Sequence, residues 1–178
     1  MVNYVERLHN YRNLLAKVNE LCSRIRSEYG DVIFCMEGCD GCCRHISLFP
    51  VEAVALAAAL QEFSPEECAH IRKLARASSA EACPLLENGR CLLYAYRPII
   101  CRTHGFPMLA GREGEKALDF CPKNFKGVAS FNATAVLNLD LLNATLASIN
   151  AVFISSCERD PCKSKERFSI AEALLLDW

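Results

Sequence analysis

The sequence has almost no net charge: 20 Lys and Arg residues against 21 Asp and Glu residues give −1 at pH 7. It therefore lacks the basic surplus that attracts nucleic acid or an anionic membrane surface, and we expect neither as a partner. Uncharged apolar runs are short as well. None reaches the roughly 18–20 residues that a membrane-spanning helix needs, since the richest stretch, 133–154, contains Asp140. The first residues carry charges early and lack the apolar stretch of a secretory signal, so we expect a cytoplasmic location.

Cysteine, by contrast, is abundant, with 12 in 178 residues. In a reducing compartment such a number indicates metal binding or catalysis rather than disulfides. The length suits a single domain, 1–178, that buries a real core, and the hydrophobic content of 52% is ordinary for a folded protein.

The stretch Cys35–Cys43, CMEGCDGCC, holds four cysteines within nine residues. Soft thiolates at such short spacing are typical ligands of zinc or of an iron–sulfur cluster. A helix would also gather these sulfurs near one side. However, Gly38 and Gly41 weaken a helix and favour a tight loop. The alternative, a reduced cysteine cluster without metal, is disfavoured by this density of cysteines.

A second group of cysteines follows in the region 82–122, which is rich in proline and poor in helical pattern. Two short apolar runs flank Asn88-Gly89 and predict a hairpin, with Cys83 and Cys91 near opposite ends of its strands. We expect the rest of this region to be irregular and to return to the first cysteines. The candidate metal ligands are therefore the eight cysteines of the loop-rich regions: Cys35, Cys39, Cys42, Cys43, Cys83, Cys91, Cys101 and Cys121.

The other cysteines fit structural or surface positions. Cys22 and Cys68 lie on apolar helical patterns, so we expect them in the core and not on metal. Cys157 and Cys162 flank a charged stretch and are predicted to be surface cysteines, with a small site of their own as the alternative. His45 and His104 stand close to cysteines in the sequence. Each is a candidate metal ligand or proton carrier, and the alternative is a residue that only hydrogen-bonds to its neighbours.

Helical patterns surround the cysteine-rich region, which we place at about 31–125. An apolar seam over 5–27 and another over 129–152 predict two helices that pack against each other, antiparallel or crossed. Pro50 and the capping box of Ser64 predict two further helices, and Ser169 predicts a last short one. The fold class is thus mainly α: a helical domain with an irregular, cysteine-rich loop region and one short β-hairpin around a metal site.

Between Cys35 and Cys121 the chain resembles a family of zinc- or iron-chelating cysteine-cluster proteins, the CxxCxxCC family. The resemblance rests on Cys35-x3-Cys39-x2-Cys42-Cys43, on Cys83-Pro84-Leu85, on the run from Cys91 through Arg97-Pro98 to Cys101-Arg102, and on Cys121-Pro122. It implies that these eight cysteines are metal ligands. Bacterial flagellin lysine methylases look like distant relatives with such a cluster, which implies that an enzymatic role stays open.

The spacing bears on which metal is bound. Structural zinc usually takes two closely spaced pairs of cysteines, whereas only Cys39 and Cys42 have the C-x2-C spacing here. A compact triplet with a distant fourth ligand favours an iron–sulfur cluster, with zinc as the alternative. Arg97 and Arg102 could offset the negative charge of metal-bound thiolates. We expect a metal-binding protein that serves electron transfer or metal handling with an unidentified protein or electron-transfer partner.

Other function classes are a cluster-dependent modifying enzyme similar to a protein lysine methylase, and a metal that only staples the loops. Cys35, Cys39 and Cys42 also have the spacing of radical S-adenosylmethionine enzymes. Gly41 stands where those enzymes usually have an aromatic residue, and no alternation of strands and helices follows.

Cys42 and Cys43 are predicted to have unequal roles. Neighbouring side chains point in different directions, by about 100° on a helix and nearly 180° on a strand. We expect Cys42 to join Cys35 and Cys39, and Cys43 to face a ligand set drawn from the later cysteines or to hydrogen-bond to the cluster. If Cys43 joins that other set, the protein holds two metal centres side by side.

Overall fold

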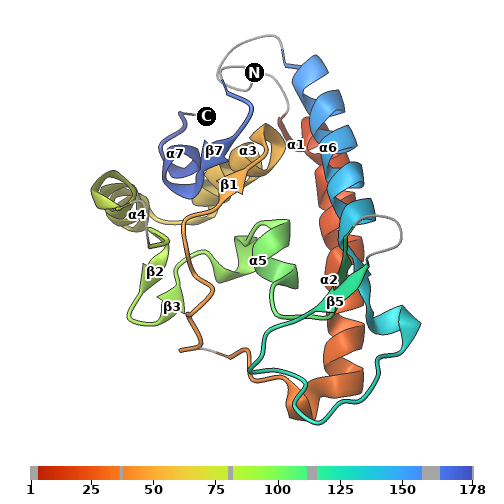
Figure 1. Ribbon diagram of the computed structural model, residues 1–178. Coiled ribbons are helices and arrows are strands. Elements are labelled where there is room, and N and C mark those ends of the chain that lie inside the picture. The colour runs from red at the N-terminus through yellow and green to blue at the C-terminus, as the bar shows by residue number, and fades with distance from the viewer. Residues whose placement is uncertain (1–3, 37, 80–81, 112–115, 158–164, 178) are drawn as a thin grey trace.

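The computed structural model describes residues 4–36, 38–79, 82–111, 116–157 and 165–177. It is mainly helical, as the sequence predicts. The short helix α1 (Tyr4–Arg7) leads into α2 (His9–Tyr29), which lies beside α6 (Leu139–Ser155). The two long helices run in opposite directions, which confirms the predicted pairing (Figure 1). Within the described residues, no helix has both the length and the apolar character needed to cross a membrane.

Helix α2 buries the seam that its sequence spacing predicts: Tyr11, Val18, Cys22 and Ile25 face the interior. The N-terminal half of α2 packs on α6 and on α3 (Pro50–Ala59), and its C-terminal half packs on Phe106 and Phe125. After Tyr29 the chain makes a short 3-10 turn, Gly30–Val32, and enters the cysteine-rich loop.

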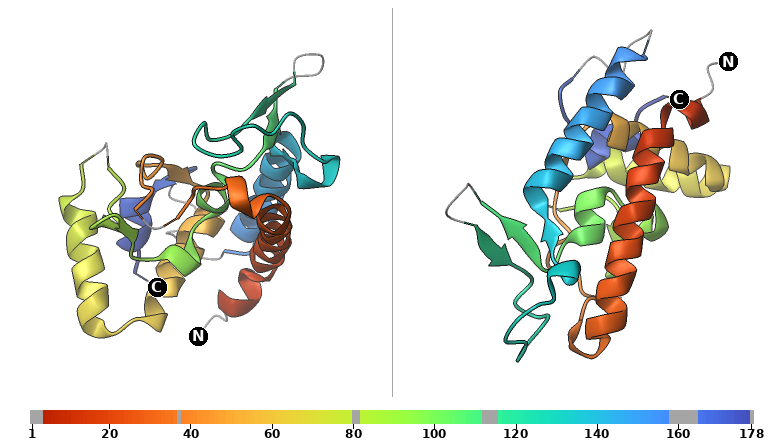
Figure 2. Two further views of the ribbon diagram at one scale, coloured as in Figure 1. Left: turned by 90° about the horizontal axis from the view of Figure 1, so that it is seen from below. Right: turned by 90° about the vertical axis from the view of Figure 1, so that its right-hand side faces the viewer.

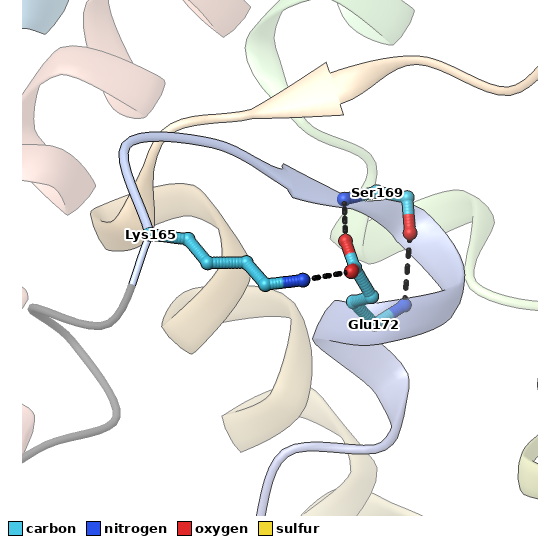
Figure 3. Close-up of polar contacts among 3 residues, drawn as sticks. All are labelled: Lys165, Ser169 and Glu172. Atoms are coloured by element: carbon cyan, nitrogen blue, oxygen red, sulfur yellow. Dashed lines mark hydrogen bonds and ion pairs between the residues drawn. The ribbon is translucent and has the colours of Figure 1, made fainter.

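A second helical layer consists of α3, α4 (Pro65–Ala77) and α7 (Ile170–Leu174). The predicted start signals are confirmed. Pro50 opens α3, and Ser64 caps α4 by accepting a hydrogen bond from the Glu67 backbone N–H. Ser169 does the same for α7 with Glu172, whose carboxylate also binds Lys165 (Figure 3). The strands β1 (Ser47–Leu48) and β7 (Phe168–Ser169), which lead into α3 and α7, pair antiparallel and so hold the starts of these two helices together.

The predicted hairpin is formed by β2 (Leu86–Glu87) and β3 (Arg90–Cys91). Asn88 at φ 51° and Gly89 at φ 75° both adopt the left-handed conformation that a type I′ turn requires. Most of the turn predicted at 111–116 lies outside the described residues.

A three-stranded sheet corrects the prediction of an irregular region up to Cys121. Strand β4 (Met108–Ala110) lies between antiparallel β5 (Ala117–Asp119) and parallel β6 (Leu137–Asn138) (Figure 2). The predicted helix over 129–152 accordingly begins only at Leu139. Residues 133–135 form a 3-10 turn, and the Asn138 side chain accepts the Leu141 N–H and starts α6 there.

Candidate metal centre

The cysteine stretch 35–43 is a loop built from tight turns, as its glycines predict. The Cys39 N–H donates to the Met36 carbonyl at 3.0 Å, and the Cys43 N–H donates to Asp40 at 2.7 Å. The Arg44 N–H then donates to the Cys42 carbonyl at 2.9 Å, a bond between residues two apart. The chain therefore turns sharply at Cys43, so that Cys42 and Cys43 can serve different surroundings.

This loop docks on the β2–β3 hairpin, which lies beside it in Figure 1. The Gly38 N–H donates to the Gly89 carbonyl at 3.2 Å, and the Cys83 N–H donates to the Cys43 carbonyl at 3.4 Å. Arg44 also forms an isolated β-bridge with Ala82. These backbone contacts bring the end of the loop next to the cysteines of the hairpin region.

Four cysteines form a first group, which we call the core group: Cys43, Cys83, Cys91 and Cys101. Burial raises the pKa of Cys43 to about 12, and the nearby sulfurs of Cys42, Cys83 and Cys91 add to this. Burial also raises the pKa of Cys101 to about 12, with contributions from Cys83, Cys91 and Cys43. The four sulfurs are thus neighbours in a poorly hydrated place.

Backbone N–H groups point at two of these sulfurs. The Leu85 N–H points to the Cys83 sulfur and the Leu93 N–H to the Cys91 sulfur, while the Leu86 N–H donates to the Cys83 carbonyl at 3.1 Å. Both bonds to sulfur favour the thiolate, although burial still leaves the pKa of each thiol raised. Leu85 and Leu93 are 2% and 0% exposed, so their side chains fix these donors against the hydrophobic core.

The other four candidates form what we call the surface group: Cys35, Cys39, Cys42 and Cys121. Burial raises the pKa of Cys35; the hydrogen bond from Asn124 opposes this rise, whereas nearby Cys39, Cys121 and Cys42 add to it. Cys42 is exposed to solvent. The Lys123 Nζ lies 4.0 Å from the Cys39 Sγ.

Asn124 is the site residue that sequence analysis missed. Its side chain is buried, and its Nδ2 donates to the Cys35 Sγ at 3.1 Å and to the Gly105 carbonyl at 3.0 Å. Its Oδ1 accepts the Phe34 N–H at 2.9 Å. One amide therefore fixes Cys35 against the loop at Gly105. An Asn in a loop usually indicates a turn, so the sequence carries no signal for this role.

The two arginines of the motif hold the loop between the hairpin and α5 (Ile99–Thr103). Arg102 donates to the carbonyls of Arg97 and Ala95 and to the Asn19 Oδ1 on α2. Arg97 donates to the Tyr94 and Cys101 carbonyls, and its charge counteracts the rise in the pKa of Cys91 and of Cys101. Both arginines are thus backbone clamps, and Arg97 also supplies the expected positive charge.

Helix α5, which carries Cys101, is anchored by Glu52 of α3. This side chain is 4% exposed, and its Oε1 accepts the Ile99 N–H at 3.3 Å while its Oε2 accepts the Phe49 N–H at 3.3 Å. Burial raises its pKa, and these hydrogen bonds partly oppose the rise. A buried carboxylate with two backbone partners therefore sets the position of α5 on α3.

The CxxCxxCC family model, described as a putative zinc- or iron-chelating domain, matches residues 34–122, half of the chain and all eight candidate cysteines. The chain belongs to the CxxCxxCC family. This membership supports metal binding, and the family's description names zinc and iron as alternative metals. Neither the curated proteins nor the solved structures contain a match to the chain.

The remaining cysteines lie apart from the CxxCxxCC sulfurs. Cys22 is buried and directs its Sγ to the Arg102 carbonyl at 3.7 Å, and the Cys68 Sγ bonds the Leu60 carbonyl at 3.0 Å. Cys157 is 2% exposed and packs in the core, so its prediction as a surface cysteine was wrong. Its apolar neighbours on α6 carry the core two residues past the helix, which ends at Ser155. Cys162 lies outside the described residues.

Of the two histidines that stand close to cysteines in the sequence, His45 contacts another side chain. The His45 Nε2 lies 3.3 Å from the Ser78 Oγ at the edge of an open cleft that Arg167 also lines. His104 follows the last residue of α5.

The donor chemistry fits a thiophilic metal, because each CxxCxxCC group offers four sulfurs with hydrogen-bond donors around them. Within the described ranges, however, no three Cys, His, Asp or Glu side chains already converge as a metal-binding group. Neighbouring sulfurs raise the pKa of Cys35, Cys43 and Cys101, but the described sulfurs are not in coordinating positions. Binding a metal would therefore require displacing the thiol protons and drawing the loops together.

Proposed function

We propose that this CxxCxxCC protein binds two metal centres side by side, one in each group of four cysteines, and uses them in electron transfer or metal handling. The observation that carries this proposal is the division of the eight sulfurs at Cys42 and Cys43. Among the other sulfurs, Cys39, Cys121 and Cys42 raise the pKa of Cys35, and Cys83, Cys91 and Cys43 raise that of Cys101, while Cys43 itself is affected by Cys42, the residue at which the two groups meet, as well as by Cys83 and Cys91.

An iron–sulfur cluster is the metal group that we favour, with zinc as the alternative. The surface group combines a compact triplet with a distant fourth cysteine that proline follows, Cys121-Pro122, as in bacterial ferredoxins. When bound, such a cluster accepts or donates an electron, at a potential that depends on burial and on hydrogen bonds to its sulfurs. A partner would then be a protein that exchanges electrons or metal with this chain.

The chain's own residues support thiolates in both groups. Asn124 and Lys123 donate toward the surface group, and the N–H groups of Leu85 and Leu93 donate toward the core group. Arg97 adds positive charge beside Cys91 and Cys101. These donors would disperse the negative charge that four thiolates bring to one metal.

The test compares Cys42→Ser with Cys43→Ser in anaerobically purified protein, by iron, sulfide and zinc content and by electronic spectrum. We expect each variant to lose one centre and to keep the other, with different residual spectra. Cys22→Ala and Cys68→Ala are matched controls that should keep all of the metal. Equal losses with the same residual spectrum would show that both cysteines serve one centre.

A further inference from the structure

The core group is fixed by the hydrophobic core. Cys83 and Cys91 pack against the buried cluster that includes Leu85 and Leu93. The same two leucines direct their N–H groups to the sulfurs. Moving either sulfur away would therefore pull a fully buried side chain out of its place or break its N–H donation.

Cys101 is held just as firmly, because two other helices, α3 and α2, anchor its helix. Glu52 on α3 accepts the Ile99 N–H at the start of α5, and the Thr103 side chain, 1% exposed, donates back to the Ile99 carbonyl at 3.1 Å. Arg102 ties the end of the same helix to Asn19 on α2. Cys83, Cys91 and Cys101 are thus built on parts of the chain that resist local opening, and Cys43 joins them from the loop 35–43, where its carbonyl accepts the Cys83 N–H at 3.4 Å.

The surface group has little of this support. Cys42 is exposed, and the residues on either side of Cys35 leave much of their surface in solvent: Phe34 is 49% and Met36 is 66% exposed. An added Cβ at Gly41 would meet nothing within 4 Å, so the loop runs through open space there. Within the described residues, the side chains that donate to its sulfurs are those of Asn124 and Lys123.

We infer that the surface group is an exchangeable metal site, whereas the core group retains its metal. This inference rests on the proposed function, since it assigns different roles to the two centres. An incoming thiolate or nitrogen ligand can reach the exposed Cys42 from solvent. In the exchange, the bond from the metal to the Cys42 sulfur breaks, a bond to the incoming ligand forms, and the freed thiolate takes a proton from water. No electron is transferred in this step.

The experiment uses the full chain loaded anaerobically with zinc, whichever metal it carries in the cell. The chelator 4-(2-pyridylazo)resorcinol reports released zinc by its absorbance, while N-ethylmaleimide labels each freed cysteine for tandem mass spectrometry. We expect two phases separated by at least about tenfold in rate, which corresponds to the loss of one hydrogen bond to a charged group. Cys35, Cys39, Cys42 and Cys121 should be labelled in the fast phase, and Cys43, Cys83, Cys91 and Cys101 in the slow one.

Two variants extend the test. Leu85→Val should speed the slow phase alone, because it loosens the side chain that fixes the N–H donor to Cys83. Leu118→Ala, at a leucine that is 41% exposed on β5, should change neither phase. Release of all zinc at one rate, or labelling of the core group first, would overturn the inference while leaving metal binding intact. A chain that takes up no zinc and contains no iron would overturn the proposed function itself.

Discussion

Gly105 is the residue whose replacement tests the geometry of the surface group most sharply. It has φ +89°, a left-handed conformation that other residues rarely adopt. A Cβ added there would lie 3.1 Å from the Asn124 Nδ2, 3.2 Å from the Cys35 Sγ and 3.3 Å from the Cys121 Cβ. All three contacts are closer than ordinary van der Waals separation, so Gly105→Ala must push Cys35, Asn124 and Cys121 apart.

The cost has two sources. The left-handed backbone costs a residue with a Cβ about 1–2 kcal/mol. Crowding a packed place with one additional carbon costs about 1–3 kcal/mol more. The expected loss for Gly105→Ala is thus roughly 2–5 kcal/mol of the free energy of unfolding, a large part of the about 5–15 kcal/mol typical of a domain.

Two other glycines separate these sources in urea unfolding of the metal-stripped, reduced chain. Gly127 has φ +83° but nothing within 4 Å of an added Cβ, so Gly127→Ala should show only the backbone cost, about 1–2 kcal/mol. Gly41 has open space and no left-handed conformation, so Gly41→Ala should be neutral or stabilising by about 0.4–1 kcal/mol. In the loaded protein, Gly105→Ala should also release metal from the surface group first. If Gly105→Ala behaves like Gly127→Ala in both measurements, the close approach of Cys35 and Cys121 at this loop is wrong.

Three further variants test the supports of the site. Asn124→Ala should lose about 1–3 kcal/mol of the free energy of unfolding in urea, because the Phe34 N–H and the Gly105 carbonyl lose their partner. The control Asn143→Ala, at an exposed residue, should show no such loss. Equal stability of the two variants would contradict the role of the buried amide. Burial raises the pKa of Glu52 above its ordinary 4.5, so its contribution to stability is complete below pH 4.5 and is lost as the pH rises through the raised pKa. The resulting slope of the unfolding free energy against pH should vanish in Glu52→Gln. An identical slope in both proteins would refute this role. Arg102→Lys keeps the charge but should lose about 1–3 kcal/mol of the free energy of unfolding, because lysine cannot reach the Arg97, Ala95 and Asn19 oxygens together. An unchanged free energy of unfolding would mean that the charge alone matters.

Features of the fold that depend on neighbours in sequence could be predicted. Pro50, Ser64 and Ser169 begin helices where capping chemistry places them, and Asn88-Gly89 forms the hairpin turn. The sheet of β4, β5 and β6 could not be predicted, because its parallel pair joins Met108 to Leu137, far apart in the chain. Three-residue strands carry too little alternation to indicate such a pairing.

The candidate site divides in the same way. The eight cysteines, and the unequal surroundings of Cys42 and Cys43, follow from local spacing and from side-chain directions along the backbone. The grouping of Cys121 with Cys35 depends on the approach of both to Gly105, which only the folded chain brings about. The burial of Asn124 beside Cys35 depends on the same tertiary contacts.

The central claim is that the chain binds two metal centres through two groups of four cysteines. Native mass spectrometry of the anaerobically purified protein counts the metal and sulfide bound to each chain, and absorption spectroscopy of the same sample distinguishes an iron–sulfur cluster from zinc. The account predicts two centres per chain, with one remaining after Cys39→Ser and one after Cys91→Ser. A single centre that disappears completely in both variants would contradict it.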